Sequence, residues 1–140
     1  MRKSLLITTV VVLAVLALSF VACEPTNPVQ MEETCIMIPL DREIMPDIEG
    51  KTLRDYFDVL VEKGFLTYEM DGTMVVTING RHADGNAKEY WMMYSNDPAN
   101  TNSTWGTYEY DGVTYGSCTL GLNELPLTEG TIYVFMISQF

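Results

Sequence analysis

Positive charge is scarce in this sequence. Its 140 residues hold 8 Lys and Arg against 19 Asp and Glu, a formal net charge of -11 at pH 7. An acidic surface repels polyanions and anionic lipid headgroups, so the composition argues against a nucleic-acid partner. Strong acidity more often serves solubility than a cationic partner, so the charge alone selects no ligand.

Residues that commonly carry catalysis or hold metals are also scarce. His82 is the only histidine and lies in a polar turn, and no serine or cysteine has an identifiable base. No cysteine has the partner spacing of a metal site. Residues 96–102, NDPANTN, offer oxygen ligands but lack the alternating acidic spacing of a calcium loop. We therefore predict no enzyme, no metal and no resident cofactor.

The N-terminus has the pattern of a secretory leader. Arg2 and Lys3 precede an apolar run over residues 5–22, and the run ends in FVAC, which resembles the bacterial lipobox. We predict a signal peptide over 1–22 and lipidation of Cys23, which would place the protein outside the cytoplasm, anchored to the membrane by its acyl chain. A plain signal peptide and an uncleaved signal anchor are the alternatives.

Cleavage before Cys23 would leave a chain of formal charge -13. Residues 23–33 are predicted to be the lipidated cysteine and a proline-containing tether, and 34–140 a single small domain. Outside the cytoplasm, Cys35 and Cys118 could form a disulfide or remain two separate buried thiols, and the sequence leaves both open.

One helix is predicted near the start of the domain. Thr52 is a plausible N-cap, with the carboxylate of Asp55 three residues later, and Gly64 fits the position that ends a helix. A short buried strand over 35–40 precedes it, with a weak strand around Ile44.

The remainder of the chain is predicted to form strands and turns. Asp71-Gly72 and Asp111-Gly112 are hairpin signals, residues 81–88 and 96–106 are predicted polar loops, and the last strand, 131–138, is apolar on both faces and therefore central. The fold class is α+β: one helix packed on a mostly antiparallel sheet. A single helix covers one face, so we expect the other face to be solvated, partnered or liganded.

The segment 89–96, EYWMMYSN, is the strongest candidate for a binding strand. Side chains alternate along a strand, which separates Tyr90 from Trp91 and Met93. We expect the set that contains Tyr90 to pack under the helix and Trp91 and Met93 to lie on the free face or near its rim. Aromatic and methionine surfaces suit flat, partly apolar ligands, but such residues are also common in buried strands.

A family resemblance adds to this interpretation. Three segments in order, GKTLRDYFDVLVEKG, VVTINGRHADGNAKEYWMMYSN and YGSCTLGLNELPLTEGTIYVFMI, resemble the transcobalamin carboxy-terminal-like domain over about residues 34–140. The resemblance implies a β-grasp-like fold and a surface that covers one face of a corrinoid. It implies Tyr90, Trp91 and Met93 as ligand-binding residues, with Trp105 in the following loop. The cobalamin carriers add a helical domain that this chain lacks, so the site would be a half-site.

Together these observations predict a non-catalytic, membrane-anchored lipoprotein that binds a small amphipathic ligand of the corrinoid type. It could pass that ligand to a transporter. The alternative is an adaptor that uses a sheet face or edge to hold another surface protein.

Overall fold

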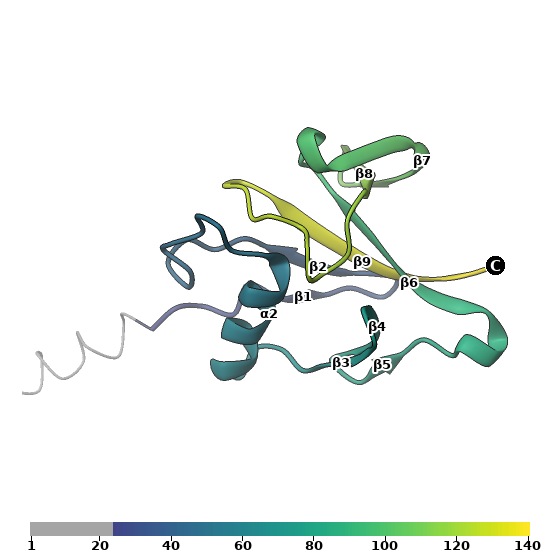
Figure 1. The fold of residues 1–140 in the computed structure, drawn as a ribbon, viewed down its shortest axis with the longest axis horizontal. Coiled ribbons are helices and arrows are strands. Elements are labelled where there is room, and N and C mark those ends of the chain that lie inside the picture. Colours follow the sequence, from purple (N-terminus) through teal and green to yellow (C-terminus); the bar gives the residue numbers. More distant parts are fainter. Residues whose placement is uncertain (1–23) are drawn as a thin grey trace, which may run out of the picture.

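The computed structural model describes residues 24–140, so the predicted signal peptide and Cys23 lie outside the described residues. Within this range, one α-helix packs on a six-stranded antiparallel sheet, with a three-stranded antiparallel sheet beside it (Figure 1). The predicted small α+β domain is confirmed. No helix of the described residues combines the length and the apolar character needed to cross a bilayer.

In the larger sheet the spatial order of the strands differs from their order along the chain. The larger sheet has the order β1 (Gln30–Met31), β2 (Ile36–Pro39), β9 (Ile132–Gln139), β6 (Glu89–Ser95), β8 (Val113–Cys118) and β7 (Thr101–Tyr110). The smaller sheet consists of β3 (Tyr68–Asp71), β4 (Met74–Ile78) and β5 (Arg81–His82).

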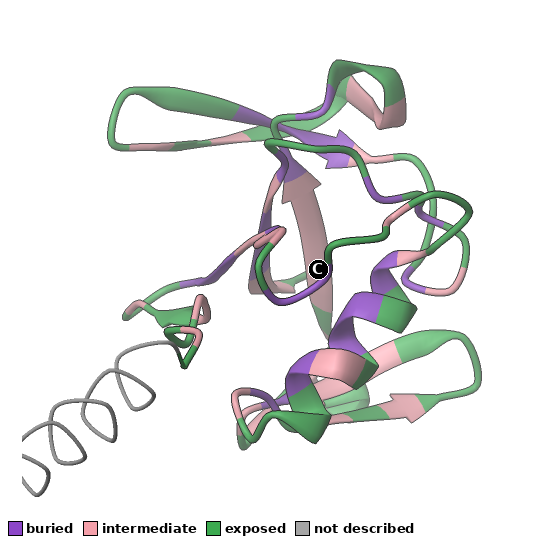
Figure 2. Ribbon diagram, turned by 90° about the vertical axis from the view of Figure 1, so that its left-hand side faces the viewer, coloured by how far each residue is buried: buried purple, intermediate pink, exposed green. Residues whose placement is uncertain are grey.

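Helix α2 (Leu53–Glu62) begins and ends where the sequence predicts. The Thr52 backbone N–H donates to Asp55 Oδ2 at 2.8 Å and the Asp55 N–H donates to Thr52 Oγ1 at 3.5 Å, which completes the capping box. Gly64 adopts φ +77°, a conformation that favours glycine and ends the helix. The buried side of α2 carries Tyr56 and Phe57, and Figure 2 shows this inner side in contrast to the exposed outer one.

The two faces of the larger sheet carry separate apolar clusters. Alternation places Ile36 and Phe135 in the cluster beneath α2, on what we call the helix face. Met37 and Val134 point the opposite way, toward what we call the hairpin face. β9 is interior to the sheet and buried on both sides, as predicted from its composition.

The β7–β8 hairpin covers the hairpin face, so the expectation that this face lies free is wrong. Figure 1 shows the hairpin on the side of β6 and β9 opposite to α2 and the smaller sheet. Tyr115 packs there with only 2% of its surface exposed, and the Tyr108 hydroxyl donates to Cys35 Sγ at 3.7 Å. The element that covers this face therefore comes from the chain itself.

Cys35 and Cys118, the two cysteines among the described residues, are free thiols, and the possible disulfide between them is not formed. Cys35 belongs to the hairpin-face cluster, whereas Cys118 packs against the helix-face cluster, so the sheet separates the two side chains. Burial raises the pKa of the Cys118 thiol to about 11, which keeps it protonated at neutral pH.

Several predicted boundaries are shifted by pairing that local sequence does not reveal. The tether is shorter, because Gln30–Met31 pairs with β2. The segment around Ile44 is a turn instead of a weak strand. The predicted polar loop over residues 81–88 includes β5. In place of the long loop predicted after β6, a short 3₁₀ turn (η2, Pro98–Asn100) leads directly into β7.

The two predicted hairpins form with different turns. Asp111 and Gly112 both have positive φ, 51° and 78°, and connect β7 to β8 as the sequence predicts. In the other hairpin Asp71 pairs with Met74, so the two turn residues are Gly72 and Thr73, one position later than predicted.

Candidate ligand-binding groove

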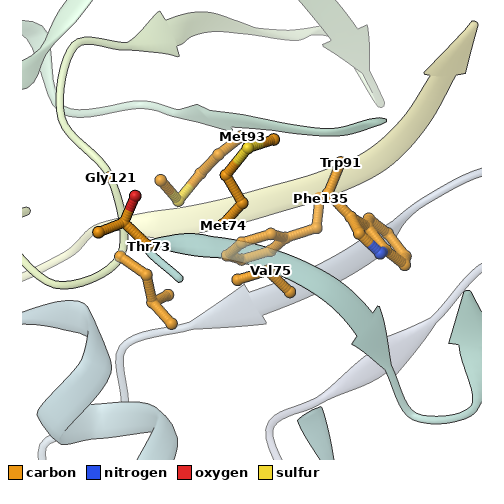
Figure 3. A pocket seen from close by; sticks show the side chains of 8 residues that line it. Thr73, Met74, Val75, Trp91, Met93, Gly121 and Phe135 are labelled. Atoms are coloured by element: carbon orange, nitrogen blue, oxygen red, sulfur yellow. The ribbon is translucent and has the colours of Figure 1, made fainter. Parts of the chain in front are cut away.

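A hollow of about 150 Å³ lies on the helix face between β4 and β6. Its lining is mostly apolar, and the close-up in Figure 3 shows the two methionines, the indole and the phenyl ring around one space. The lining side chains include Met74, Val75, Trp91, Met93, Leu122 and Phe135. We call this the first hollow.

Pairing of β6 with β9 aims Trp91 and Met93 into the first hollow. Met93 stands opposite Phe135 in the antiparallel register, so both side chains point to the helix face. Tyr94 points to the hairpin face instead. The prediction that Trp91 and Met93 lie opposite the helix is therefore wrong. They lie on the same face as α2, at a rim that borders the β3–β4 hairpin.

Trp91 also connects the two sheets. Its indole Nε1–H donates to the Val76 carbonyl oxygen of β4 at 3.1 Å, and the half-buried ring packs against the helix-face cluster. This hydrogen bond satisfies the indole N–H, so the ring offers an apolar surface to the hollow and no donor. Trp91 thus has a structural role in addition to its place in the hollow wall.

A second hollow, of about 280 Å³, adjoins the first. Both are lined by Met74 and Val75, so they meet along β4. Polar groups are more frequent in the second hollow, whose lining includes Asp71, Val76, His82, Glu89 and Tyr90. We call the two hollows together the β4–β6 groove.

The structure brings three of the four predicted ligand-binding residues to this groove. Trp91 and Met93 line the first hollow and Tyr90 lines the second. Trp105 borders neither hollow. It lies in β7 where the pairing with β8 shifts register between Asn102 and Thr107, and 63% of its surface is exposed.

Met74 is the most exposed of the large apolar groove residues that sequence reasoning missed. It follows the Gly72–Thr73 turn, lines both hollows and is 51% exposed. A large apolar residue beside a hairpin turn is the signal that could have identified it, because nothing in the turn itself can bury such a side chain.

The polar groups near the groove form local hydrogen bonds. His82 Nδ1 lies 2.8 Å from Thr77 Oγ1, and the Thr77 hydroxyl also lies 3.3 Å from Glu69 Oε2. The Glu89 carboxylate accepts from the Asp84 backbone N–H at 3.1 Å. Within residues 24–140, no group of three or more His, Cys, Asp and Glu side chains is placed to hold a metal ion. The groove thus combines a mostly apolar first hollow with a second hollow that carries two carboxylates, Asp71 and Glu89.

Part of the chain matches a known family model. Residues 50–103 match the model of a domain of unknown function, DUF4430. That range contains α2, all of β3 to β6 and the start of β7, and therefore most of the groove, but not Leu122 or Phe135. No curated protein and no solved structure matches the chain. The resemblance to cobalamin carriers stays a prediction.

Proposed function

We propose that this domain binds a small amphipathic molecule in the β4–β6 groove without catalysis. The observation that supports this most directly is the convergence of Met74, Trp91 and Met93 on one apolar hollow, beside a second hollow that carries more polar groups. Concave, mostly apolar sites with a few polar groups are the usual form of small-molecule sites. A corrinoid is the ligand class that the family resemblance suggests.

The dimensions of the groove favour partial coverage of the ligand. Small-molecule pockets commonly hold about 300–1,000 Å³, and neither hollow reaches that range alone. The two hollows together do reach it, since they hold about 150 and 280 Å³. A corrin ring is larger than the groove, so this domain would hold one edge or face of it. A transporter or another surface protein would complete the enclosure.

We further propose that the domain works outside the cytoplasm, tethered to the membrane through a lipid on Cys23. This part of the proposal depends on the leader-like pattern of residues 1–22 and the cysteine that follows it. Metabolic labelling with a clickable fatty acid tests it. The wild-type chain should incorporate the label and the Cys23→Ser variant should not, and equal labelling of both would refute lipidation at this residue.

Tryptophan fluorescence can test corrinoid binding, because the two tryptophans lie in different places. In a Trp105→Phe variant the only indole is Trp91, in the wall of the first hollow. Addition of cobinamide to this variant should quench its emission saturably. In the matched Trp91→Phe variant the only indole is the exposed Trp105, and we expect just the linear loss caused by light absorption.

Two results would contradict corrinoid binding in the groove. The first is the same linear loss in both variants up to high micromolar cobinamide. The second is saturable quenching of Trp105 alone, which would move the site to β7. A Met74→Ala variant adds a groove control that keeps both tryptophans. It should weaken cobinamide binding several-fold, because Met74 lines both hollows.

A protein-binding adaptor is the second candidate function. The exposed Trp105 on β7, which is an edge strand of the larger sheet, favours it. A photo-crosslinking amino acid at position 105 in cells tests this candidate, with the same amino acid at the exposed position 49 as control. A discrete crosslinked product at 105 alone would support an adaptor, and identical patterns at both positions would contradict it.

A further inference from the structure

We propose that the ligand of the β4–β6 groove carries a positive charge, with its apolar body in the first hollow and its cationic end in the second. This inference rests on the proposed function and specifies the ligand class. The adjacency of the two hollows supports it, since Met74 and Val75 line both. A single molecule can therefore contact both environments.

The first hollow selects for an apolar body. Its wall consists mainly of thioether, indole, phenyl and aliphatic groups, and the indole N–H of Trp91 is already bonded to the Val76 carbonyl oxygen. A polar group placed there would lose its hydrogen bonds to water and gain little in return. Flat aromatic or alicyclic groups gain contact area without that loss.

The second hollow selects for a cation. Asp71 and Glu89 both line it, and no lysine or arginine lines it among the described residues. Glu89 is half-buried, and its bond from the Asp84 N–H fixes the carboxylate at the hollow. Tyr90 also lines the hollow, and its ring packs against Phe140, with 6.1 Å between the ring centroids. Two carboxylates in one hollow favour an ammonium or similar group.

The charge of the whole chain acts in the same direction. A net charge of -11 raises the local concentration of cations around the protein and lowers that of anions. That long-range effect would be shared by every surface of the protein. If the groove itself prefers cations, that preference must depend on Asp71 and Glu89 more than on other acidic residues. Substitution of these two residues therefore separates the local effect from the effect of the net charge.

Three naphthalene probes that differ in charge test the proposal: 1-naphthalenemethylammonium, 1-naphthalenemethanol and 1-naphthaleneacetate. They are titrated into purified protein with ¹³C-labelled methionine methyl groups. Shifts of the Met74 and Met93 methyls report binding in the groove, and Met37 on the opposite face serves as an internal reference. We expect the affinities to fall in the order cation, neutral, anion. The cation should bind about tenfold more tightly than the anion at low salt, and the ratio should fall toward one at 1 M salt.

A matched pair of variants locates the charge effect. The double variant Asp71→Asn, Glu89→Gln removes two charges from the second hollow, and Glu49→Gln, Glu62→Gln removes two from exposed positions elsewhere. The first should abolish most of the preference for the cation, and the second should keep it. An unchanged Met37 methyl resonance verifies that each variant is folded.

The outcomes separate this inference from the proposed function. Equal binding of all three probes at Met74 and Met93 would overturn the charge preference and leave the groove as a ligand site. Equal loss of preference in both double variants would also overturn it, since only the overall charge would matter. Absence of any shift at Met74 and Met93 would overturn both proposals.

Discussion

The β7–β8 hairpin, at one end of the larger sheet, and the β3–β4 hairpin of the smaller sheet lie on opposite sides of β6 and β9, and they cover these strands to different extents. The β7–β8 hairpin folds over the hairpin face and leaves Cys35 and Tyr115 only 1% and 2% exposed. The β3–β4 hairpin packs beside the helix face, but its tip leaves the β4–β6 groove and a Met74 that is 51% exposed. Both hairpins are antiparallel pairs with two-residue turns, so the type of element does not determine whether a face is closed.

The difference lies in the side chains that each hairpin offers. Tyrosines of β7 and β8 are long enough to reach Cys35 and the strands beneath, and the Tyr108 hydroxyl contacts the Cys35 sulfur. At the tip of the β3–β4 hairpin the corresponding residues are Gly72, Thr73 and Met74, and these cannot fill the space above Met93. The closed face stabilises the fold, whereas the open one leaves a hollow at its surface.

The largest expected effect is the loss of a side chain that closes the hairpin face. Tyr115→Ala should reduce the free energy of unfolding by about 3–5 kcal/mol, as for other fully buried large aromatics. Met74→Ala should cost below about 1 kcal/mol, because half of its surface is already in water. Urea unfolding monitored by circular dichroism measures both, and similar costs for the two variants would contradict the contrast between the hairpins.

The second largest expected effect is a loss of folding stability at alkaline pH, caused by buried groups of the helix face. Burial raises the pKa of Tyr56 and Tyr133 to about 12 and that of Cys118 to about 11. In the unfolded chain the pKa is near 9 for the cysteine and near 10 for the tyrosines. Below these pH values the raised folded-state pKa values contribute fully to stability, and the contribution is lost as pH rises toward 11 for Cys118 and 12 for the tyrosines. We expect a loss of about 1 kcal/mol or more per group between pH 8 and pH 11. Thermal unfolding across this range would contradict the expectation if Tm stayed constant.

Two buried tyrosines of the helix face should respond differently to loss of the hydroxyl. The Tyr56 hydroxyl donates to the Pro39 carbonyl oxygen at 2.8 Å and accepts from the Asp41 N–H at 3.1 Å, so Tyr56→Phe should cost about 1–3 kcal/mol. The Tyr133 hydroxyl is buried without a hydrogen-bond partner among the described residues, so Tyr133→Phe should be neutral or stabilising. Guanidinium unfolding of both variants provides the comparison. A larger cost for Tyr133→Phe would contradict the assignment of these bonds.

The smallest expected effect is that of oxidation on Cys35 and Cys118, which lie on opposite faces of the sheet. Because the sheet separates Cys35 from Cys118, oxidising conditions should not link them within the folded chain. Electrophoretic mobility of the Cys23→Ser variant should be the same with and without reductant, and two thiols should react with a disulfide reagent after unfolding. A faster-migrating band that reductant removes would indicate a disulfide and overturn this arrangement.

The sequence was sufficient for the features that depend on neighbouring residues. Thr52, Asp55 and Gly64 act within one helix, and Asp111-Gly112 has the left-handed backbone that its hairpin requires, so local rules predicted them. The α+β class followed from the same elements.

The features that the sequence did not reveal depend on long-range pairing. Both faces of β6 are apolar, so alternation separates Trp91 from Tyr94 but cannot say which of them meets the helix. The register with β9 decides that, because Met93 stands opposite Phe135. The placement of Trp105 away from the groove depends likewise on the register shift between β7 and β8. Three of the four candidate site residues were found because aromatic and methionine side chains are concentrated in one strand.

The most direct test of the groove as a ligand site is a measurement of nuclear Overhauser effects between bound 1-naphthalenemethanol and the methionine methyl groups. The account predicts cross-peaks from the naphthalene protons to Met74 and Met93, and none to Met37 beneath the β7–β8 hairpin. Cross-peaks to Met37, or to neither face at saturating probe, would contradict the claim that the helix face holds the open site.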